Sequence, residues 1–166
     1  DDYDLITVED DEYAEDLFEI VTFSKDYHET DAFRYTPNSD GTAIITEYVG
    51  SSAYVTVPAE IDGYKITKMG TNTFEKHKDT LKELIISDGI EYVDGCEGCV
   101  KLYKVTLPES VKIIDSFRNC TALESITLPF IGSSRTAKGT ASGVFGYIFG
   151  YFQNSTYNTQ YNKKDT

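Results

Sequence analysis

The centre of the chain repeats an apolar pattern at a constant step, which leads from Leu81 to Leu102 and from there to Leu123. Each copy opens with a leucine, has an aliphatic residue three positions later and a second one two positions after that. The copies hold these positions as Leu81, Leu84 and Ile86, as Leu102, Val105 and Leu107, and as Leu123, Ile126 and Leu128. Self-similarity of this length predicts a repeat architecture, in which neighbouring copies stack and share one core.

Each copy is predicted to form one coil of a solenoid. Residues 84–86 and 105–107 alternate inward and outward positions as a strand does, and Pro108 and Pro129 end the strand because proline cannot donate to a ladder. A second extended piece is expected at 111–114. The Phe-x-x-Cys piece before the next leucine predicts a single helical or 3₁₀ turn. One coil alone cannot bury its apolar residues, so stacking is required.

A looser copy precedes these coils. Residues 55–58 (VTVP) match 105–108 (VTLP), and Phe74 matches Phe117. Residues 62–65, around Gly63, indicate a turn insertion. His77 occupies the position at which the later coils have Cys99 and Cys120.

The pattern L-x-x-[VI]-[TI]-[LI]-P-x-x-[VI]-x-x-[IV]-x-x-F-x-x-C resembles the BspA-type leucine-rich repeat, an extracellular class common in surface proteins of bacteria and some protists. Residues 55–74 resemble the typical amino-terminal coil of that family, and 33–50 resemble the hairpin-like cap before it. Residues 128–134 and 145–150 resemble an irregular segment that many members contain. The coils here are slightly shorter than is usual, and Cys96 stands where the family usually has Phe.

We therefore expect an α/β repeat protein that is rich in β-structure: a short right-handed leucine-rich repeat solenoid with a parallel sheet, capped at both ends. The expected segments are an acidic amino-terminal segment or cap (1–32), a repeat domain (33–152) and a polar tail (153–166). Within the repeat domain they are a cap (33–54), coils at 55–80, 81–101 and 102–122, and an irregular last part (123–152).

The two ends do not repeat. Residues 8–20 are expected to form a helix that caps the open end of the core, although Phe18, Ile20 and Thr22 alternate as in a strand and leave that alternative open. Residues 153–166 indicate a frayed tail, or a linker before further repeats. Because the only methionine is Met69, we expect the natural protein to begin upstream of Asp1.

Charge argues against two classes of partner. Residues 1–31 hold 13 acidic residues and one basic residue, so nearly all of the net charge of −13 lies there and the rest of the chain is close to neutral. Binding to nucleic acid or to an anionic membrane needs clustered Lys and Arg, which the chain lacks. No apolar run approaches the roughly 20 residues that cross a bilayer, so no membrane span is expected.

The cysteines and His77 raise the question of a metal. His77, Cys99 and Cys120 fall at equivalent positions, with Cys96 nearby, and four such ligands suit zinc. The competing interpretation, which we favour, is that Cys99 and Cys120 are small core residues with free thiols. A Cys99–Cys120 disulfide is geometrically conceivable between coils about 4.8 Å apart.

No other motif predicts a cofactor, a metal or catalysis. The acidic run at 9–12 lacks the spacing of a calcium loop and indicates a solvated face. Residues 132–140 suggest a phosphate loop but lack its GK[ST] signature, and we interpret them as a mobile surface loop. His28 and His77 have no recognisable nucleophile near them. We therefore expect a protein that is not an enzyme.

The outward residues of the strands are the candidate binding surface. The predicted columns are Thr56, Ile85, Thr106 and Thr127; Glu83, Lys104 and Ser125; and Lys82, Tyr103 and Glu124. Thirteen tyrosines suit protein recognition, and the absence of Trp disfavours sugar stacking. The resemblance implies a secreted or cell-surface module for protein binding and adhesion, whose partner is a host extracellular-matrix protein. A monomer is expected. A carbohydrate-binding accessory module and a structural spacer are the alternatives.

Overall fold

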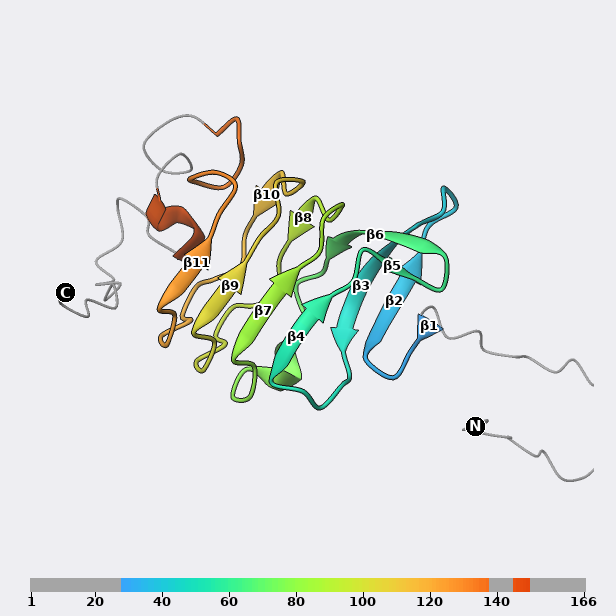
Figure 1. Ribbon diagram of the computed structural model, residues 1–166, viewed down its shortest axis with the longest axis horizontal. Helices are drawn as coiled ribbons and strands as arrows, with labels where there is room; N and C mark the ends of the chain where they lie inside the picture. Colours follow the sequence, from blue (N-terminus) through green and yellow to red (C-terminus); the bar gives the residue numbers. More distant parts are fainter. Residues whose placement is uncertain (1–27, 138–144, 150–166) are drawn as a thin grey trace, which may run out of the picture.

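Two β-sheets wind around one narrow core. A computed structural model describes residues 28–137 and 145–149, and from β6 to β11 successive strands alternate between the two sheets (Figure 1). The elements are β1 (His28–Glu29), β2 (Phe33–Pro37), β3 (Thr42–Tyr48), β4 (Tyr54–Val57), β5 (Glu60–Ile61), β6 (Tyr64–Met69), η1 (Glu75–His77), β7 (Glu83–Ile86), β8 (Tyr92–Val93), β9 (Lys104–Thr106), β10 (Ile113–Ile114), β11 (Ser125–Thr127) and η2 (Phe145–Phe149).

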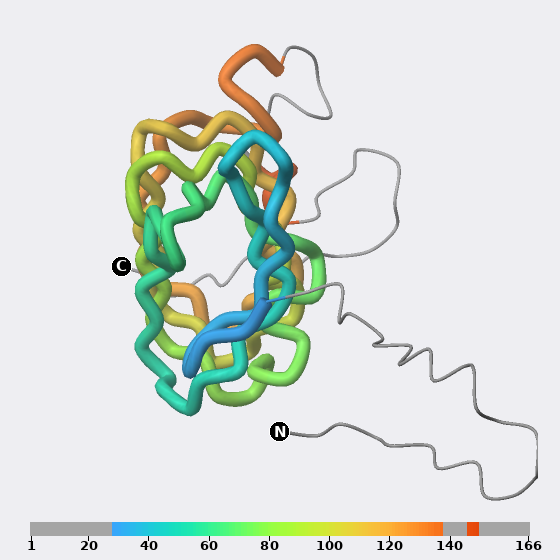
Figure 2. The backbone as a smooth tube through the Cα atoms, turned by 90° about the vertical axis from the view of Figure 1, so that its right-hand side faces the viewer, coloured from blue at the N-terminus to red at the C-terminus, as the bar shows by residue number. Residues whose placement is uncertain are grey.

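The four-stranded sheet carries the repeat. Its order is β11-β9-β7-β4, and all of its pairs are parallel. Leu84 pairs with Val105, and Val105 pairs with Ile126, so each step across β7, β9 and β11 is the repeat step of the sequence. The predicted stack of coils is confirmed. Seen along the stack, the coils outline successive loops around the core (Figure 2).

The seven-stranded sheet forms the opposite wall. Its order is β1-β2-β3-β6-β8-β10, and β5 pairs with β6. Tyr92 pairs with Ile113 in the parallel pair β8–β10, again at the repeat step, so the second extended piece of each coil is present. The turn insertion is a tight hairpin from β5 to β6, in which Asp62 and Gly63 both have positive φ angles. Such angles match the right-handed twist of the two strands.

The leucine rungs lie between the sheets. Leu81 and Leu102 are fully buried, as are Phe74 and Phe117. Cys96, at the usual position of Phe, is also fully buried. Leu123 is only partly buried, because it lies in the last coil of the described stack, next to β9 on one side alone.

Gly95 is required by the way in which two coils meet. Its φ angle is +86°, and a Cβ atom there would lie 2.3 Å from the carbonyl oxygen of Gly70. Its own carbonyl accepts a hydrogen bond of 3.2 Å from the N–H of Phe74. Only glycine combines the left-handed backbone with so close an approach between neighbouring coils.

Helix is nearly absent, which corrects the α/β part of the predicted class. The described residues contain two short 3₁₀ helices and no α-helix, so this part of the protein is β-rich. The Phe-x-x-Cys piece is helical only in the first coil, where η1 follows Phe74. In the next two coils it is a turn, closed by hydrogen bonds from Cys99 N–H to Cys96 and from Cys120 N–H to Phe117. The predicted helix at 8–20 lies outside the described residues.

An antiparallel hairpin adjoins the first coil. Strand β2 pairs with β3, and β3 continues into the parallel ladder through β6. Phe33, Tyr35 and Tyr48 turn their rings into the core. On the outer surface Arg34 contacts Glu29 and Glu47, and Lys76 of η1 lies 2.6 Å from the other Glu47 oxygen. The hairpin that the resemblance implies is therefore present and is joined to the first coil.

The segment after β11 turns back onto β10. Ser134 forms an antiparallel bridge with Ile113, and Ser133 accepts a hydrogen bond of 3.0 Å from Ile114 N–H. The Arg135 guanidinium pairs with Glu109 and lies over the Phe130 ring. Residues 132–134 are therefore held against the sheet rather than free in a surface loop, because backbone groups at the edge of β10 bind them. Among the described residues, no helix is long and apolar enough to span a bilayer.

Replacing Leu102 with alanine tests the stack. Leu102 is fully buried and lies between neighbouring coils on both sides, so Leu102→Ala should lower the free energy of unfolding by about 2–5 kcal/mol. Urea denaturation followed by circular dichroism measures this. The matched control is Leu123→Ala, which removes a partly buried side chain and should cost at least ~1 kcal/mol less. An equal loss of unfolding free energy in the two variants would contradict the finding that Leu102 is more deeply buried than Leu123.

The Glu47 network should make stability depend on pH. The ammonium of Lys76 first, and then the guanidinium of Arg34, lower the pKa of Glu47 below its ordinary value in the folded state. A lowered folded pKa adds stability above the unfolded pKa, and this stability is lost as pH falls through the folded pKa. Glu47→Gln should therefore cost about 1 kcal/mol near pH 7, and this cost should shrink as the pH falls below the ordinary glutamate pKa.

Denaturation of both proteins across this pH range measures the difference. Glu29→Gln is the control, because Glu29 also pairs with Arg34 but is more exposed, at 43% against 19% for Glu47. Its effect should be smaller at every pH. A Glu47→Gln cost that did not change with pH would exclude the carboxylate's charge as the cause.

Candidate functional site

The outer face of the four-stranded sheet presents side chains in straight columns. Strand pairing aligns Tyr54, Glu83, Lys104 and Ser125 in one column, and Thr56, Ile85, Thr106 and Thr127 in another. Backbone hydrogen bonds of 2.9 Å, from Tyr103 N–H to Lys82 and from Glu124 N–H to Tyr103, align the third column. No register shift interrupts these pairs, whereas β2–β3 and β3–β6 of the opposite sheet contain shifts. The sheet thus brings together every predicted site residue.

Exposure differs between the columns. Ile85 is 43% exposed, and Thr56, Thr127 and Lys82 are also exposed. Glu83, Tyr103 and Thr106 are half-buried. The most exposed apolar side chains therefore lie on β4 and β7. On β9 and β11 the same surface presents hydroxyl groups.

Glu83, Tyr103 and Lys104 form a connected group within this surface. The Tyr103 hydroxyl donates a hydrogen bond to Glu83, and the Lys104 ammonium lies 3.6 Å from the other Glu83 oxygen. The hydrogen bond to Glu83, together with burial, raises the pKa of Tyr103 to about 12. Tyr103 is therefore a protonated donor at neutral pH, and its ring is fixed across the boundary between two coils.

Sequence reasoning missed Tyr54. It is 58% exposed and opens the column that continues through Glu83 and Lys104. The signal was present, since Tyr54 directly precedes the buried Val55 that aligns with Leu84. Extending the register by one residue toward the amino terminus assigns Tyr54 to the surface.

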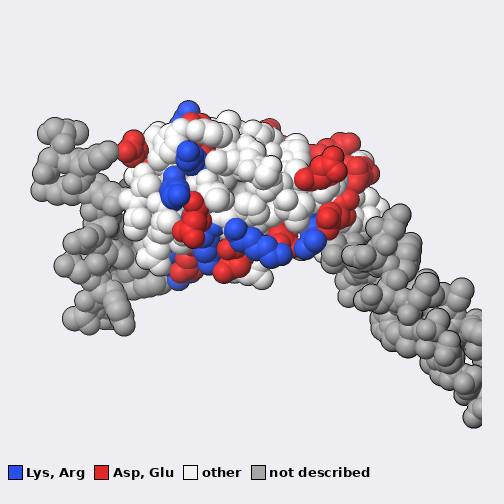
Figure 3. Space-filling view, turned by 90° about the horizontal axis from the view of Figure 1, so that it is seen from below, with Lys and Arg blue, Asp and Glu red and all other residues white. Residues whose placement is uncertain are grey.

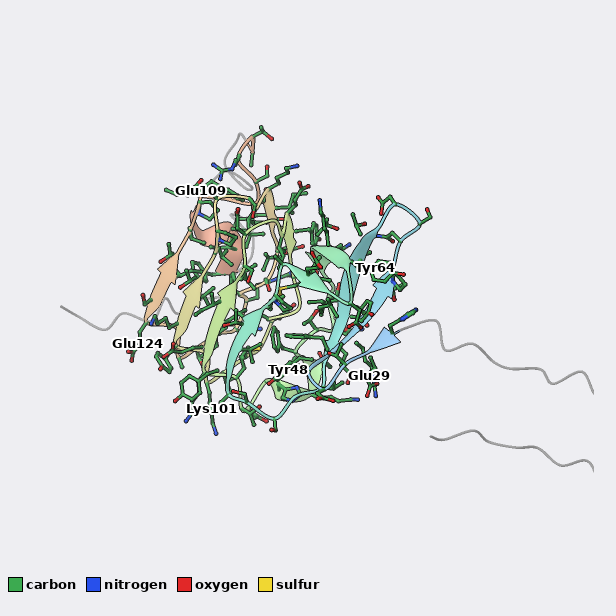
Figure 4. The ribbon with its side chains drawn as sticks, turned by 45° about the vertical axis from the view of Figure 1, so that its right-hand side comes forward. Glu29, Tyr48, Tyr64, Lys101, Glu109 and Glu124 are labelled. Carbon is green, nitrogen blue, oxygen red and sulfur yellow. The ribbon has the colours of Figure 1, made fainter. Side chains whose placement is uncertain are left out.

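Charged residues of both signs surround the columns. Lys101 and Glu124 lie at the end of the sheet where the strands begin (Figure 4). From below, basic side chains lie next to acidic ones (Figure 3). On the side of the opposite sheet, ion pairs also join adjacent coils, such as Lys112 with Glu91 at 2.7 Å and Arg118 with Glu97 at 3.9 Å.

The His77 ring has partners other than the cysteines. The His77 Nε2 lies 2.9 Å from the Gly50 carbonyl oxygen, and its ring stacks edge-on against Tyr48 at 4.7 Å. The cysteines are buried free thiols, and the Cys120 thiol donates to the Cys96 carbonyl at 3.1 Å. Within the described residues, no group of three His, Cys, Asp or Glu side chains is placed to hold a metal ion.

Comparison with solved structures identifies the fold. A leucine-rich cell-surface protein of Faecalibacterium prausnitzii has a TM-score of 0.55 and 27% identity over 66% of this chain. A leucine-rich repeat protein of Bacteroides ovatus has a TM-score of 0.52 and 26% identity over 61% of it. The leucine-rich repeat protein of Treponema pallidum has a TM-score of 0.52 and 24% identity, also over 61%. The chain has a leucine-rich repeat fold.

The leucine-rich repeat resemblance seen in the sequence is therefore confirmed at the level of fold, with neighbours among bacterial repeat proteins. The chain spans 32% of the Faecalibacterium protein, 29% of the Bacteroides protein and 50% of the Treponema protein. No family model matches the sequence, and a comparison with curated proteins finds no match.

The buried thiols of this repeat should be chemically inert. Burial, the largest cause, raises the pKa of Cys99 to about 12 and that of Cys120 to about 11, and it also raises the pKa of Cys96. Because the thiolate is the reactive form, a chromogenic thiol reagent at pH 8 should react with none of the three in the native protein. All three should react in denaturant. Rapid native labelling would contradict the placement of these side chains in the core.

Proposed function

We propose that this chain is a non-catalytic protein-binding module of the BspA-like type, acting on the cell surface or after secretion. The observation that supports it is the regular, outward array on the four-stranded sheet, where aromatic, aliphatic and hydroxyl side chains stand on a rigid ladder. Tyr and aliphatic residues on a rigid backbone suit protein contact, because they add area at low cost in conformational entropy.

The comparisons with solved structures support the proposed location at the cell surface and the absence of catalysis. One neighbour is a cell-surface protein of a bacterium, and bacterial leucine-rich repeat proteins are generally not enzymes. An adhesive role toward a host extracellular-matrix protein, exercised by a monomer, is the specific form of the proposal. The three columns, from Thr56 and Lys82 to Glu124 and Thr127, would make the contact.

Two isoleucines allow a matched test. Ile85 lies on the four-stranded sheet and is 43% exposed, and Ile113 lies on the opposite sheet and is 41% exposed. Ile85→Glu should weaken binding to a matrix protein about tenfold, because it places a charge in the centre of the contact. Ile113→Glu should change binding less than twofold.

The measurement is biolayer interferometry against purified laminin, collagen and fibronectin, with a glycan array in parallel and thermal denaturation to show that both variants fold. Equal losses for the two variants would exclude the four-stranded face as the site. Binding on the glycan array alone would favour the carbohydrate-binding alternative. Absence of binding in both assays would favour a spacer.

A further inference from the structure

The charges of the four-stranded face do not all neutralise one another. Lys104 is paired with Glu83 of the coil before it. Lys82 and Lys101 are both exposed, and neither side chain has an ion pair or hydrogen bond with a described residue. Two positive charges therefore remain available where the strands begin.

The backbone holds both lysines firmly. The Lys82 N–H donates to the Ala53 carbonyl at 2.7 Å, and the Lys82 carbonyl accepts from Tyr103 N–H at 2.9 Å. Lys101 directly precedes Leu102, which is fully buried. The two residues lie in adjacent coils, and they are diagonal rather than direct neighbours, because the residue beside Lys82 is Tyr103, two positions after Lys101. Both side chains are therefore exposed at the end of the sheet, on backbone that the stacked coils hold in place.

An apolar spot lies beside this pair. Tyr54 and Ile85 are exposed on adjacent strands, and they are diagonal neighbours because Tyr54 pairs with Glu83, two residues before Ile85. Diagonal neighbours lie about 7–8 Å apart, which leaves room for one side chain to contact both. The exposed lysines and the exposed apolar side chains therefore lie close together at the end of the sheet where the strands begin.

The backbone groups of Tyr54, on the free edge of β4, already have hydrogen-bond partners. Residues 53, 55 and 57 direct their backbone groups toward β7, so those of Tyr54 point to the open edge. The Ser52 hydroxyl binds both of them: it accepts from Tyr54 N–H at 3.1 Å and donates to the Tyr54 carbonyl at 2.8 Å. Because these backbone groups are already hydrogen-bonded, a partner cannot pair with them as an added strand. It would bind the face of the sheet instead.

We propose that this face binds an acidic, extended segment of a protein partner. The segment crosses the strands, places carboxylates at Lys82 and Lys101, and inserts one apolar side chain between Tyr54 and Ile85. The inference rests on the proposed function and specifies its partner. Charge complementarity selects the acidic segment, since Lys82 and Lys101 have no acidic partner among the described residues, whereas Glu83 is already bound by Tyr103 and Lys104.

The test uses the full chain and a fluorescein-labelled heptapeptide, Asp-Glu-Asp-Phe-Asp-Glu-Asp, in fluorescence anisotropy. The peptide should bind, and a peptide with lysine at every acidic position should not. Lys82→Gln and Lys101→Gln should each weaken binding three- to tenfold. Lys65→Gln is the matched control, because Lys65 is an exposed lysine without a side-chain partner on the opposite sheet, and it should have no effect. Raising salt from 50 to 500 mM should also weaken binding, because these charges are exposed.

Four results would overturn the inference. The first is equal binding of the acidic and basic peptides, and the second is an equal effect of the three lysine variants. The third is tighter binding of a heparin hexasaccharide, which would assign the lysines to a sulfated glycan. The fourth is peptide binding seen only after Glu9, Asp10, Asp11 and Glu12 are changed to their amides, which would assign the face to the chain's own acidic segment. If Ile85→Glu weakens matrix binding about tenfold while the acidic peptide does not bind, the proposed function stands and this inference fails.

Discussion

Parallel pairing between coils, at one constant step along the sequence, is the constraint on which this structure depends. A coil such as 81–101 has too few apolar residues to bury them alone, so its leucine becomes core only when the next coil covers it. Leu81 and Leu102 are fully buried for this reason, and Leu123, next to β9 on one side alone, is not. The same ladder sets the outward columns, because a strand that buries Leu84 must expose Ile85.

The stack also decides which charges the surface displays. Lys104, Lys112 and Arg118 follow Glu83, Glu91 and Glu97 by one repeat step, and the structure places each of these bases against the matching acid. Exposed pairs of this kind add little to stability, about 0–1 kcal/mol each. Their larger consequence concerns charge: they pair the three glutamates of the coil 81–101, whereas the side chains of Lys82 and Lys101 have no acidic partner among the described residues.

The amino-terminal side of the core is built by different means. An antiparallel hairpin lies beside the first coil, and its aromatic rings, rather than a leucine rung, meet the core. Tyr48 shows how tightly this junction is made, since its ring contacts Phe33, Phe74 and His77 and its hydroxyl binds the backbone of Ser52. The Arg34–Glu47–Lys76 contacts join the hairpin to η1 from outside. At this junction, aromatic packing and ion pairs hold the hairpin to the first coil, in place of a repeated leucine.

The repeat alone determined the strand register, the leucine rungs and the outward columns, because a constant step with alternating burial leaves only one register for the strands. Local sequence did not determine which contacts form between coils. The pairing of Glu83 with both Tyr103 and Lys104, the contact of His77 with Gly50 and the return of Ser134 to β10 depend on residues that lie at least 20 positions apart in the sequence. Side-chain reach and local backbone direction decide such contacts, and they exist only once the coils are stacked.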